Sequence, residues 1–283
     1  MCTYYNKVIN CLVANNTAIT SGGGMYSHGS DSIINSTLVN NQSLYGGAYY
    51  SYHLLNRITS FLNCIIWGNK TGENSYNSIE DDQGLTTCYY SAIEGGYEGE
   101  HNIDISNMQL FVNPSLTAGS DDDTPDVNWH LLPNSVCIDN GLNDSVTSNV
   151  DLDGLPRINC GTVDMGCYEY FPTHEFYDTA NNSFVWHNTT YTTGGDYYWI
   201  DSTMSGCDTI HILHLTITVG IEDHNLGASM AVYPNPTTGV VNVECTMNNG
   251  QAEAMEFQLF DAFGRLLRIT DGVETQNFAS CSV

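Results

Sequence analysis

A seven-residue pattern that returns four times constrains this chain more than any other feature. The copies share a mostly apolar middle and end in Asn or Gly: Asn10–Asn16, Asn35–Asn41, Asn63–Asn69 and Tyr90–Gly96. Their first residues stand 25, 28 and 27 positions apart. Sequence repeats of roughly 20 to 50 residues are typical of solenoids, in which each repeat packs mainly on its neighbours. The pattern therefore predicts a stack of similar coils.

The side chains within the copies follow the period of a β-strand. Every second position carries a small or medium-sized residue, and we expect this set to face inward: Ile9, Cys11, Val13, Ile34, Ser36, Leu38, Leu62, Cys64 and Ile66. The alternate positions mix polar and apolar residues, as an outer face does. Asn residues and the glycine clusters at 22–24 and 46–47 supply the left-handed backbone angles of turns. The sequence thus predicts an all-β chain that opens with a right-handed parallel β-helix, its coils about 4.8 Å apart.

Two resemblances support this interpretation. The Asn-rich strand ends and the Gly-Gly-x-Tyr turns resemble the repeats of bacterial surface β-helix proteins of the autotransporter and polymorphic outer-membrane type. Seven further pieces resemble, in the same order, the closing end of secreted β-helix proteins that carry the choice-of-anchor Q region: Ser91–Tyr97, His101–Asp104, Leu110–Pro114, Trp129–Leu131, Cys137–Gly141, Asp151–Arg157 and Val163–Glu169. The resemblance implies that residues 1–105 are β-helix coils of the pectin-lyase-like fold and that residues 106–170 form their C-terminal closing region.

The composition changes after Tyr170. Residues 171–219 consist of short β-branched and aromatic runs separated by Gly and Asn turns, which predicts a small β-sandwich module. They resemble a module of large secreted adhesins in which a Trp strand, a Tyr-Thr-x-x-Gly turn and a Gly-Cys-Asp-x-Ile strand recur. In that module the cysteine has an upstream partner, but Asn181 and Asn182 stand in the expected region. The resemblance therefore leaves Cys207 unpaired.

Residues 220–283 resemble the C-terminal sorting domain that the type IX secretion system recognises. The resemblance rests on Val232–Val243 and Phe257–Leu267, with these motif residues: Tyr233, Pro234, Asn235, Pro236, Thr238, Gly239, Asp261, Gly264 and Arg265. It implies an Ig-like β-sandwich that is incomplete, because the family's last two strands are not found before Val283. It also implies type IX machinery as a partner and a location outside a Gram-negative cell or on its surface.

Charge excludes two classes of partner. Six Lys and Arg residues face 32 Asp and Glu residues, which gives a formal net charge of −26. Phosphate binding needs clustered Lys and Arg, so we expect neither nucleic acid nor anionic membrane as a partner. No apolar run approaches the roughly 18 residues of a transmembrane span. The first residues do not resemble a signal peptide, and we expect an export signal and earlier coils in a part that precedes this sequence.

Candidate sites are few. We predict no catalytic residue, because no carboxylate cluster stands beside Arg57 in the repeats, as the acids and bases of β-helix enzymes would require. We predict no cofactor. Asp151 and Asp153 are spaced like the opening of a calcium loop, but no Glu follows at the distal ligand position, so we expect them to cap a turn, with Ca²⁺ binding as the alternative. Cys160 and Cys167 flank a predicted turn and are our predicted disulfide.

Two functional hypotheses follow. The first is an adhesin-like or structural surface protein that binds glycan or protein. Its binding surface would be an outer face rich in tyrosines that suit stacking on sugars, namely Tyr26, Tyr45, Tyr49, Tyr50 and Tyr52. The second is a polysaccharide lyase or glycoside hydrolase of the pectin-lyase-like fold, with its catalytic coils in the preceding part of the protein.

Overall fold

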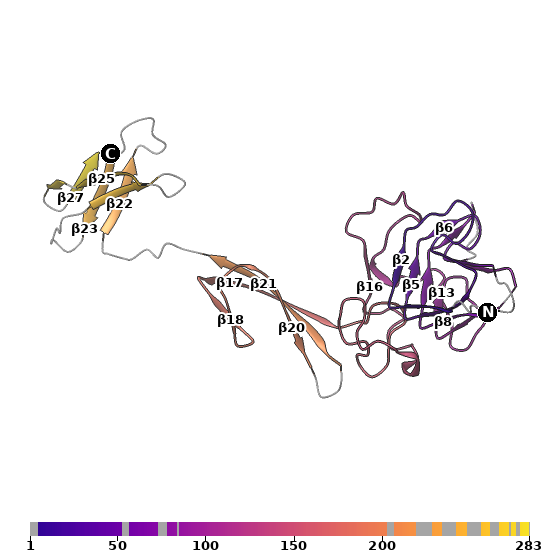
Figure 1. Cartoon of the computed structure of the whole chain (residues 1–283). Coiled ribbons are helices and arrows are strands. Elements are labelled where there is room, and N and C mark those ends of the chain that lie inside the picture. The colour runs from indigo at the N-terminus through magenta and orange to yellow at the C-terminus, as the bar shows by residue number, and fades with distance from the viewer. Residues whose placement is uncertain are drawn as a thin grey trace. The chain divides into compact units, whose positions relative to one another are not determined.

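A computed structural model describes residues 5–52, 57–72, 78–83, 85–202 and 207–218, and beyond them the backbone of six strands between residues 228 and 282. Apart from a short 3-10 helix, Asn143–Ser145, every regular element in these ranges is a β-strand (Figure 1). The predicted all-β class is therefore confirmed. None of the described residues belongs to a helix that is long and apolar enough to cross a membrane.

Three parallel sheets share the strands of residues 5–104. The first contains β1 (Tyr5–Ile9), β4 (Ser30–Ile34), β8 (Thr59–Leu62) and β12 (Thr86–Tyr89). The second contains β2 (Leu12–Ala14), β5 (Thr37–Val39), β9 (Ile65–Trp67), β13 (Ala92–Ile93) and β14 (Ile103–Asp104). The third contains β3 (Met25–Ser27), β7 (Tyr49–Ser51) and β11 (Ile79–Asp81). A short parallel pair, β6 (Gln42–Ser43) and β10 (Lys70–Thr71), completes these coils.

The strand register repeats the spacing of the sequence pattern. In the second sheet, Leu12 pairs with Thr37, Thr37 with Ile65, and Ile65 with Ala92. These partners are 25, 28 and 27 residues apart, the spacings of the four pattern copies. Figure 1 shows β2, β5 and β13 lying along one another. Each pattern copy therefore occupies the same place in successive coils.

The first residue of each pattern copy is a corner between two sheets. Asn10, Asn35 and Asn63 have φ angles of 50°, 45° and 53°, and Tyr90 has 48°. These angles lie in the left-handed region, which Asn adopts more easily than most residues because its side chain bonds locally. The corner interrupts the strand alternation, so the inward positions change phase there.

This phase change corrects the predicted inward set. After the corner, Ser36, Leu38, Cys64 and Ile66 are buried, as predicted. Before the corner, we predicted that Ile9, Ile34 and Leu62 face inward. The inner core is instead formed or lined by the residues one position earlier and their equivalent in the fourth coil, namely Val8, Ile33, Phe61 and Cys88. An uninterrupted alternation across Asn10, Asn35 and Asn63 could not place both halves correctly, because their left-handed backbone rotates the chain between them.

A second core covers the face that we expected to be exposed. Val39 and Ile65, both predicted to point outward, are 0% and 1% exposed. They pack against closing-region residues, among them Leu110, Phe111, Trp129, Leu131 and Met165. In that region β15 (Phe111–Asn113) pairs antiparallel with β16 (Asn128–Leu131). The second sheet therefore has the inner core on one face and the closing region, residues 106–170, on the other.

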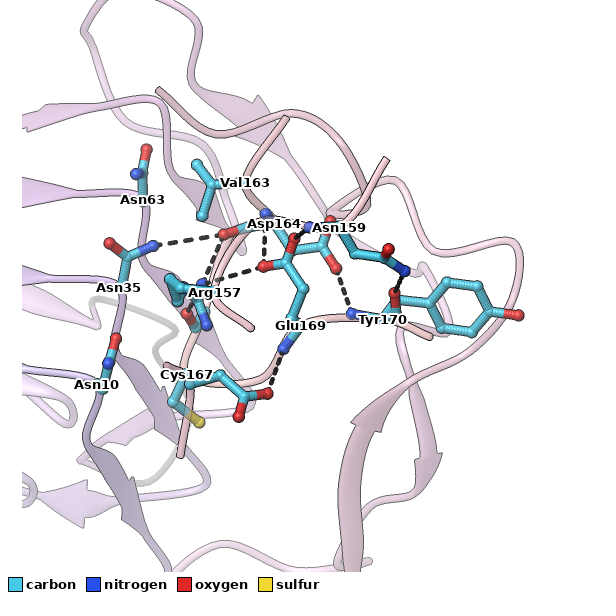
Figure 2. Close-up of polar contacts among 12 residues, drawn as sticks. Asn10, Asn35, Asn63, Arg157, Asn159, Val163, Asp164, Cys167, Glu169 and Tyr170 are labelled. Carbon is cyan, nitrogen blue, oxygen red and sulfur yellow. Dashed lines mark hydrogen bonds and ion pairs between the residues drawn. The ribbon is translucent and has the colours of Figure 1, made fainter. Parts of the chain in front are cut away.

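The corner asparagines also hold the closing region in place. Figure 2 shows Asn10, Asn35 and Asn63 in a column on neighbouring strands. Their Nδ2 atoms donate to three different backbone carbonyls, those of Val150 (2.6 Å), Asp164 (3.5 Å) and Leu142 (3.1 Å). One residue type therefore does two things: it adopts the corner angle and it satisfies a carbonyl of the covering chain.

The remaining strands form smaller sheets. β17 (Thr173–Asn181), β21 (Thr209–Thr218) and β20 (Gly195–Asp201) form one sheet, and β18 (Phe184–Trp186) with β19 (Thr189–Tyr191) forms a hairpin. Where we expected a small sandwich, the described residues form this open sheet and hairpin, and most side chains of β17 and β20 are exposed. The terminal strands are β22 (Ala228–Tyr233), β23 (Asn242–Met247), β27 (Phe278–Ser282) and β26 (Val273–Thr275) in one sheet, with β24 (Glu256–Phe260) and β25 (Leu266–Asp271) as a hairpin.

Contacts divide the chain into two compact units. One contains residues Met1–Asp178 and Gly194–Leu215, and the other contains Thr179–Thr193 and Thr216–Val283. The coils and the closing region lie in the first unit, and the terminal strands lie in the second.

Candidate ligand-binding surface

Aromatic side chains gather on the outer face of the sheet formed by β3, β7 and β11. The register places Tyr26 beside Tyr50, and Tyr50 beside Glu80. Alternate side chains of a strand share a face, so the residues two positions on form a second row: His28, Tyr52 and Asp82. Two parallel rows of side chains therefore cross three coils.

The rings in these rows contact one another. Tyr26 and Tyr50 stack with ring centroids 5.5 Å apart and an interplanar angle of 14°. The His28 ring meets Tyr26 edge-on at 5.0 Å and Tyr52 at 5.8 Å. Tyr26 is 50% exposed and Tyr52 is 44% exposed. We call Tyr26, His28, Tyr50 and Tyr52 the aromatic face, because their rings contact one another; Tyr26, His28 and Tyr52 are exposed and Tyr50 is half-buried.

Glycines in the preceding turns allow the chain to pass close to the tyrosines of β3 and β7. Gly22 and Gly46 have φ angles of 67° and 59°, which glycine adopts without steric cost. A Cβ atom at Gly22 would lie 2.8 Å from the Cβ of Tyr26, and one at Gly46 would lie 2.9 Å from the Cβ of Tyr50. The matching runs Gly22–Tyr26 and Gly46–Tyr50 of the sequence therefore reflect a close approach between each turn and the tyrosine four residues later.

Carboxylates border the aromatic face. Oε2 of Glu80 accepts the backbone N–H of Gly46 at 3.0 Å, which fixes this side chain beside the tyrosine row. Burial first, and then the charges of Asp82 and Glu80, raise the pKa of Tyr50 above its ordinary value. Arg57 brings a cation to the edge, where its Nη1 donates to the His28 carbonyl at 2.6 Å. The face is thus aromatic in the middle and acidic along one side.

The five predicted tyrosines do not all lie on the aromatic face. Tyr26, Tyr50 and Tyr52 lie together, as the stacking hypothesis requires. Tyr49 was predicted wrongly: it is fully buried, its hydroxyl donates to Oδ2 of Asp31 at 3.0 Å, and burial raises its pKa to about 12. It alternates with Tyr50 along β7 and therefore points inward. Tyr45 is exposed on the preceding segment, where its backbone bridges to a neighbouring coil.

The predicted calcium residues are engaged in hydrogen bonds. Oδ1 of Asp151 accepts the backbone N–H groups of Asp153 and Leu155 at 3.0 and 2.9 Å, and its Oδ2 accepts that of Glu169 at 2.9 Å. Oδ2 of Asp153 lies 2.6 Å from Nε2 of His130. Within the described part of the chain, no group of three or more His, Cys, Asp or Glu residues is placed to hold a metal ion. The contacts of Asp151 are those of a turn cap, and calcium binding here stays a prediction.

Two of the closing-region pieces meet in a buried polar cluster that sequence reasoning missed. Arg157 is 1% exposed, and its Nη2 donates to the carbonyls of Asp164 and Gly166 at 2.9 and 2.8 Å (Figure 2). The same nitrogen lies 3.8 Å from Oε2 of Glu169. The Asp164 carboxylate accepts the backbone N–H groups of Asp139 and Tyr170. This cluster ties the end of the closing region together.

The two carboxyl groups of this cluster hold protons that exposed carboxyls would release. Burial first, together with the charge of a neighbouring carboxylate, raises the pKa of Asp164 to about 7 and that of Glu169 to about 9. The folded chain therefore binds more protons than the unfolded chain between about pH 4 and pH 9. Their stabilising contribution is complete below the unfolded-state pKa values and is lost as pH rises through the folded-state values.

We therefore expect the first unit to melt at a lower temperature at pH 9 than at pH 5. Thermal unfolding followed by circular dichroism across this range checks the prediction. The variant Glu169→Gln removes one of the two titrations and should have a flatter pH profile than the parent. A melting temperature that rises between pH 5 and pH 9 would contradict the assignment.

The disulfide prediction was wrong. Cys160 is bonded to Cys207, across 47 residues, while Cys167 is a buried free thiol. Beside the bond, the Asn159 side chain pairs in both directions with the backbone of Asp208, at 3.1 and 2.6 Å. Cys207 therefore does have an upstream partner, but it lies in the closing region and not near Asn181, where the resemblance had placed it. Cys167 is fully buried, and its backbone N–H donates to Oγ1 of Thr37 at 3.0 Å.

Peptide mapping without reduction is expected to recover a Cys160–Cys207 linked peptide. Closing a loop of this length stabilises a fold by about 4 kcal/mol in the chain-entropy model, so Cys207→Ser should lower the free energy of unfolding by an amount of that order. Cys11→Ser, at a free and partly exposed thiol, is the control and should change little. A linked Cys160–Cys167 peptide would restore the original pairing.

An open hollow of about 380 Å³ lies between the fourth corner and the closing region. It is lined by Tyr90, His101, Asn102, Ile103, Asp139, Asn140 and Gly141. The Asn102 amide is used by the carbonyls of Cys88 and Tyr97, and that of Asn140 by two carbonyls of its own turn. Because the side-chain amides of Asn102 and Asn140 already donate to backbone carbonyls, they are not available to a ligand. We therefore place the candidate ligand-binding surface on the aromatic face.

The predicted sorting motif falls almost entirely outside the described residues. Only Tyr233 is placed, at the end of β22, where its backbone pairs with Asn242 of β23. Pro234–Gly239 and Asp261–Arg265 are not described. Comparison with family models supplies what the geometry does not: residues 231–282 match the secretion system C-terminal sorting domain. No curated protein and no solved structure matches the chain at a significant level.

The match identifies residues 231–282 as a type IX C-terminal sorting domain. Such a domain is handled by the type IX secretion machinery and marks a secreted or cell-surface protein. The sorting-domain resemblance drawn from the sequence is therefore confirmed over residues 231–282, and it implies export by the type IX machinery to the outside or the surface of the cell.

Proposed function

We propose that this chain is an adhesin-like surface protein that binds glycan through its aromatic face. In this proposal residues 1–105 are coils of a right-handed parallel β-helix, residues 106–170 are a choice-of-anchor Q-type closing region, and the sorting domain delivers the whole to the cell surface. Parallel strands at the spacing of the sequence repeat, covered on one side by the closing region, support the β-helix part.

The observation that carries the binding proposal is a set of contacting rings on one sheet, of which Tyr26, His28 and Tyr52 are exposed. Exposed tyrosines that stack within a monomer are well suited to the apolar faces of sugar rings, and their hydroxyls can bond sugar hydroxyls. Tyr26 and Tyr50 lie on neighbouring coils, so their spacing follows the coil repeat. An extended polysaccharide that runs along the coils could pack against the exposed parts of both rings and bond their hydroxyls.

We expect Tyr26→Ala and Tyr50→Ala each to weaken glycan binding by about 1 kcal/mol, roughly fivefold in dissociation constant. Hits from a glycan array, measured again by calorimetry with the full chain, provide the ligands. Tyr89→Ala is the matched control, because Tyr89 is 41% exposed but belongs to β12 in another sheet.

The proposal predicts that only substitutions on the aromatic face weaken glycan binding. If Tyr89→Ala weakened binding as much as Tyr26→Ala, or if neither variant changed the affinity, the ligand would bind elsewhere and the aromatic face would not be the site. If the array gave no binding at all, the adhesin proposal would lose its support.

A further inference from the structure

Two tyrosines of the aromatic face lie side by side on neighbouring coils. Tyr26 of β3 pairs in register with Tyr50 of β7, so their backbones lie about 4.8 Å apart, as neighbouring strands do. Their ring centroids are 5.5 Å apart, and their ring planes differ by 14°. Tyr26 is 50% exposed and Tyr50 is half-buried. Two phenols are therefore in near contact at a surface that solvent reaches.

Coupling of two phenols by a soluble oxidant requires both exposure and a second phenol within reach. The adjacent Tyr49 lacks the first, because it is fully buried and its hydroxyl donates to a carboxylate. Tyr89 is 41% exposed, but its partner in register on the next coil is Leu62. Tyr26 and Tyr50 meet both requirements.

The reaction that joins two such phenols is oxidative coupling. Hydrogen peroxide, acting through a peroxidase, removes one electron and the hydroxyl proton from each phenol, which gives two phenoxyl radicals. The radicals form one carbon–carbon bond between the ring positions next to their oxygens. The hydrogen at each of these positions then moves to the neighbouring oxygen, which restores both phenols. The product lacks two hydrogen atoms, and one hydrogen peroxide becomes two waters.

We propose that Tyr26 and Tyr50 are a site of oxidative cross-linking, at which a dityrosine bond joins two neighbouring coils. Among the described strands, β3 is the edge strand of its sheet, next to β7, and β1 and β2 are edge strands of the other two sheets. Edge strands separate most easily, because they are paired on one side only. The bond fastens this edge coil to the next coil, and it does not depend on the proposed glycan binding.

The test treats the full chain with hydrogen peroxide and a haem peroxidase, at a protein concentration low enough to keep chains apart. We expect the monomer fraction to gain dityrosine fluorescence. Digestion should release a peptide that joins Tyr26 to Tyr50 and lacks two hydrogen atoms. During limited proteolysis, the cross-linked monomer should be cleaved more slowly within residues 5–27 than the untreated chain, because the edge coil can no longer separate.

Three variants identify the source of the dityrosine. Tyr26→Phe and Tyr50→Phe keep the ring and remove only the hydroxyl, so the coils should fold as in the parent, which circular dichroism checks. Each variant is expected to lose nearly all dityrosine from the monomer fraction. Tyr89→Phe is the matched control, because it removes a comparably exposed hydroxyl from another sheet, and it should retain the cross-link.

Several results would overturn the proposal. Dityrosine found only between chains, or a linked peptide that joins other tyrosines, would place the reaction elsewhere. Equal losses in Tyr26→Phe and Tyr89→Phe would show that coupling does not depend on the stacked pair. Treated parent protein without dityrosine would show that these rings do not couple. A Tyr26–Tyr50 peptide without slower proteolysis would support the cross-link and refute its fastening of the edge coil.

Discussion

Deleting residues 231–282 is expected to retain nearly all of this protein inside a bacterium that carries a type IX system. The family match covers these residues, and the machinery that exports such proteins acts on this domain. The coils and the closing region lie in the other compact unit, so they should fold without the deleted strands. Cell fractionation, together with protease digestion of intact cells, measures how much of the chain reaches the surface.

Two controls make the deletion informative. Limited proteolysis of the retained chain should yield a resistant fragment that contains the coils, which would show that the loss concerns export and not folding. Fusing residues 220–283 to an unrelated periplasmic protein should move part of that protein to the surface. Normal surface display of the deleted chain would show that another segment directs its export.

Arg157→Met is expected to lower the free energy of unfolding of the first unit by about 3 to 5 kcal/mol, because it removes one partner from a buried charged cluster. The substitution abolishes two hydrogen bonds to the carbonyls of Asp164 and Gly166 and leaves Glu169 without a cation. For a unit of this size the melting temperature should fall by roughly 10 °C. Chemical and thermal denaturation of the full chain measure both quantities.

The pH dependence of this loss distinguishes charge from packing. At pH 5 both carboxyls can hold a proton, whereas at pH 8 their ionisation is opposed still more strongly once the guanidinium is gone. The loss should therefore be larger at pH 8. Lys70→Met removes an exposed cation and should change stability by less than about 0.5 kcal/mol. An Arg157→Met loss below about 1 kcal/mol, or one independent of pH, would mean that the cluster contributes packing alone.

The repeat could be predicted from the sequence because each coil uses the same local chemistry. Asn tolerates left-handed angles and recurs at the corners, so the spacing of Asn10, Asn35 and Asn63 predicts the register of three strands. What the pattern could not supply was the effect of the corner on the alternation. A strand template assumes one phase throughout, and each left-handed residue starts another.

Contacts between distant segments lie beyond such local reasoning. Whether Val39 faces solvent depends on a closing region about 70 residues away, and the partner of Cys207 depends on how that region meets β21. Similarly, Tyr26 and Tyr50 share a turn pattern and could be grouped, whereas Glu80 joins them only through the register of a strand without that pattern. The candidate site was therefore predicted in its tyrosines and missed in its carboxylates.

The column of corner asparagines has a consequence for how such a protein can change in length. Asn10, Asn35 and Asn63 each bind a different carbonyl of the covering chain. Insertion or loss of a whole coil between them would shift every later asparagine to the wrong carbonyl, even though the coil itself would stack without strain. The closing region therefore fits a fixed number of coils. Evolutionary gain or loss of repeats should be confined to coils that it does not cover.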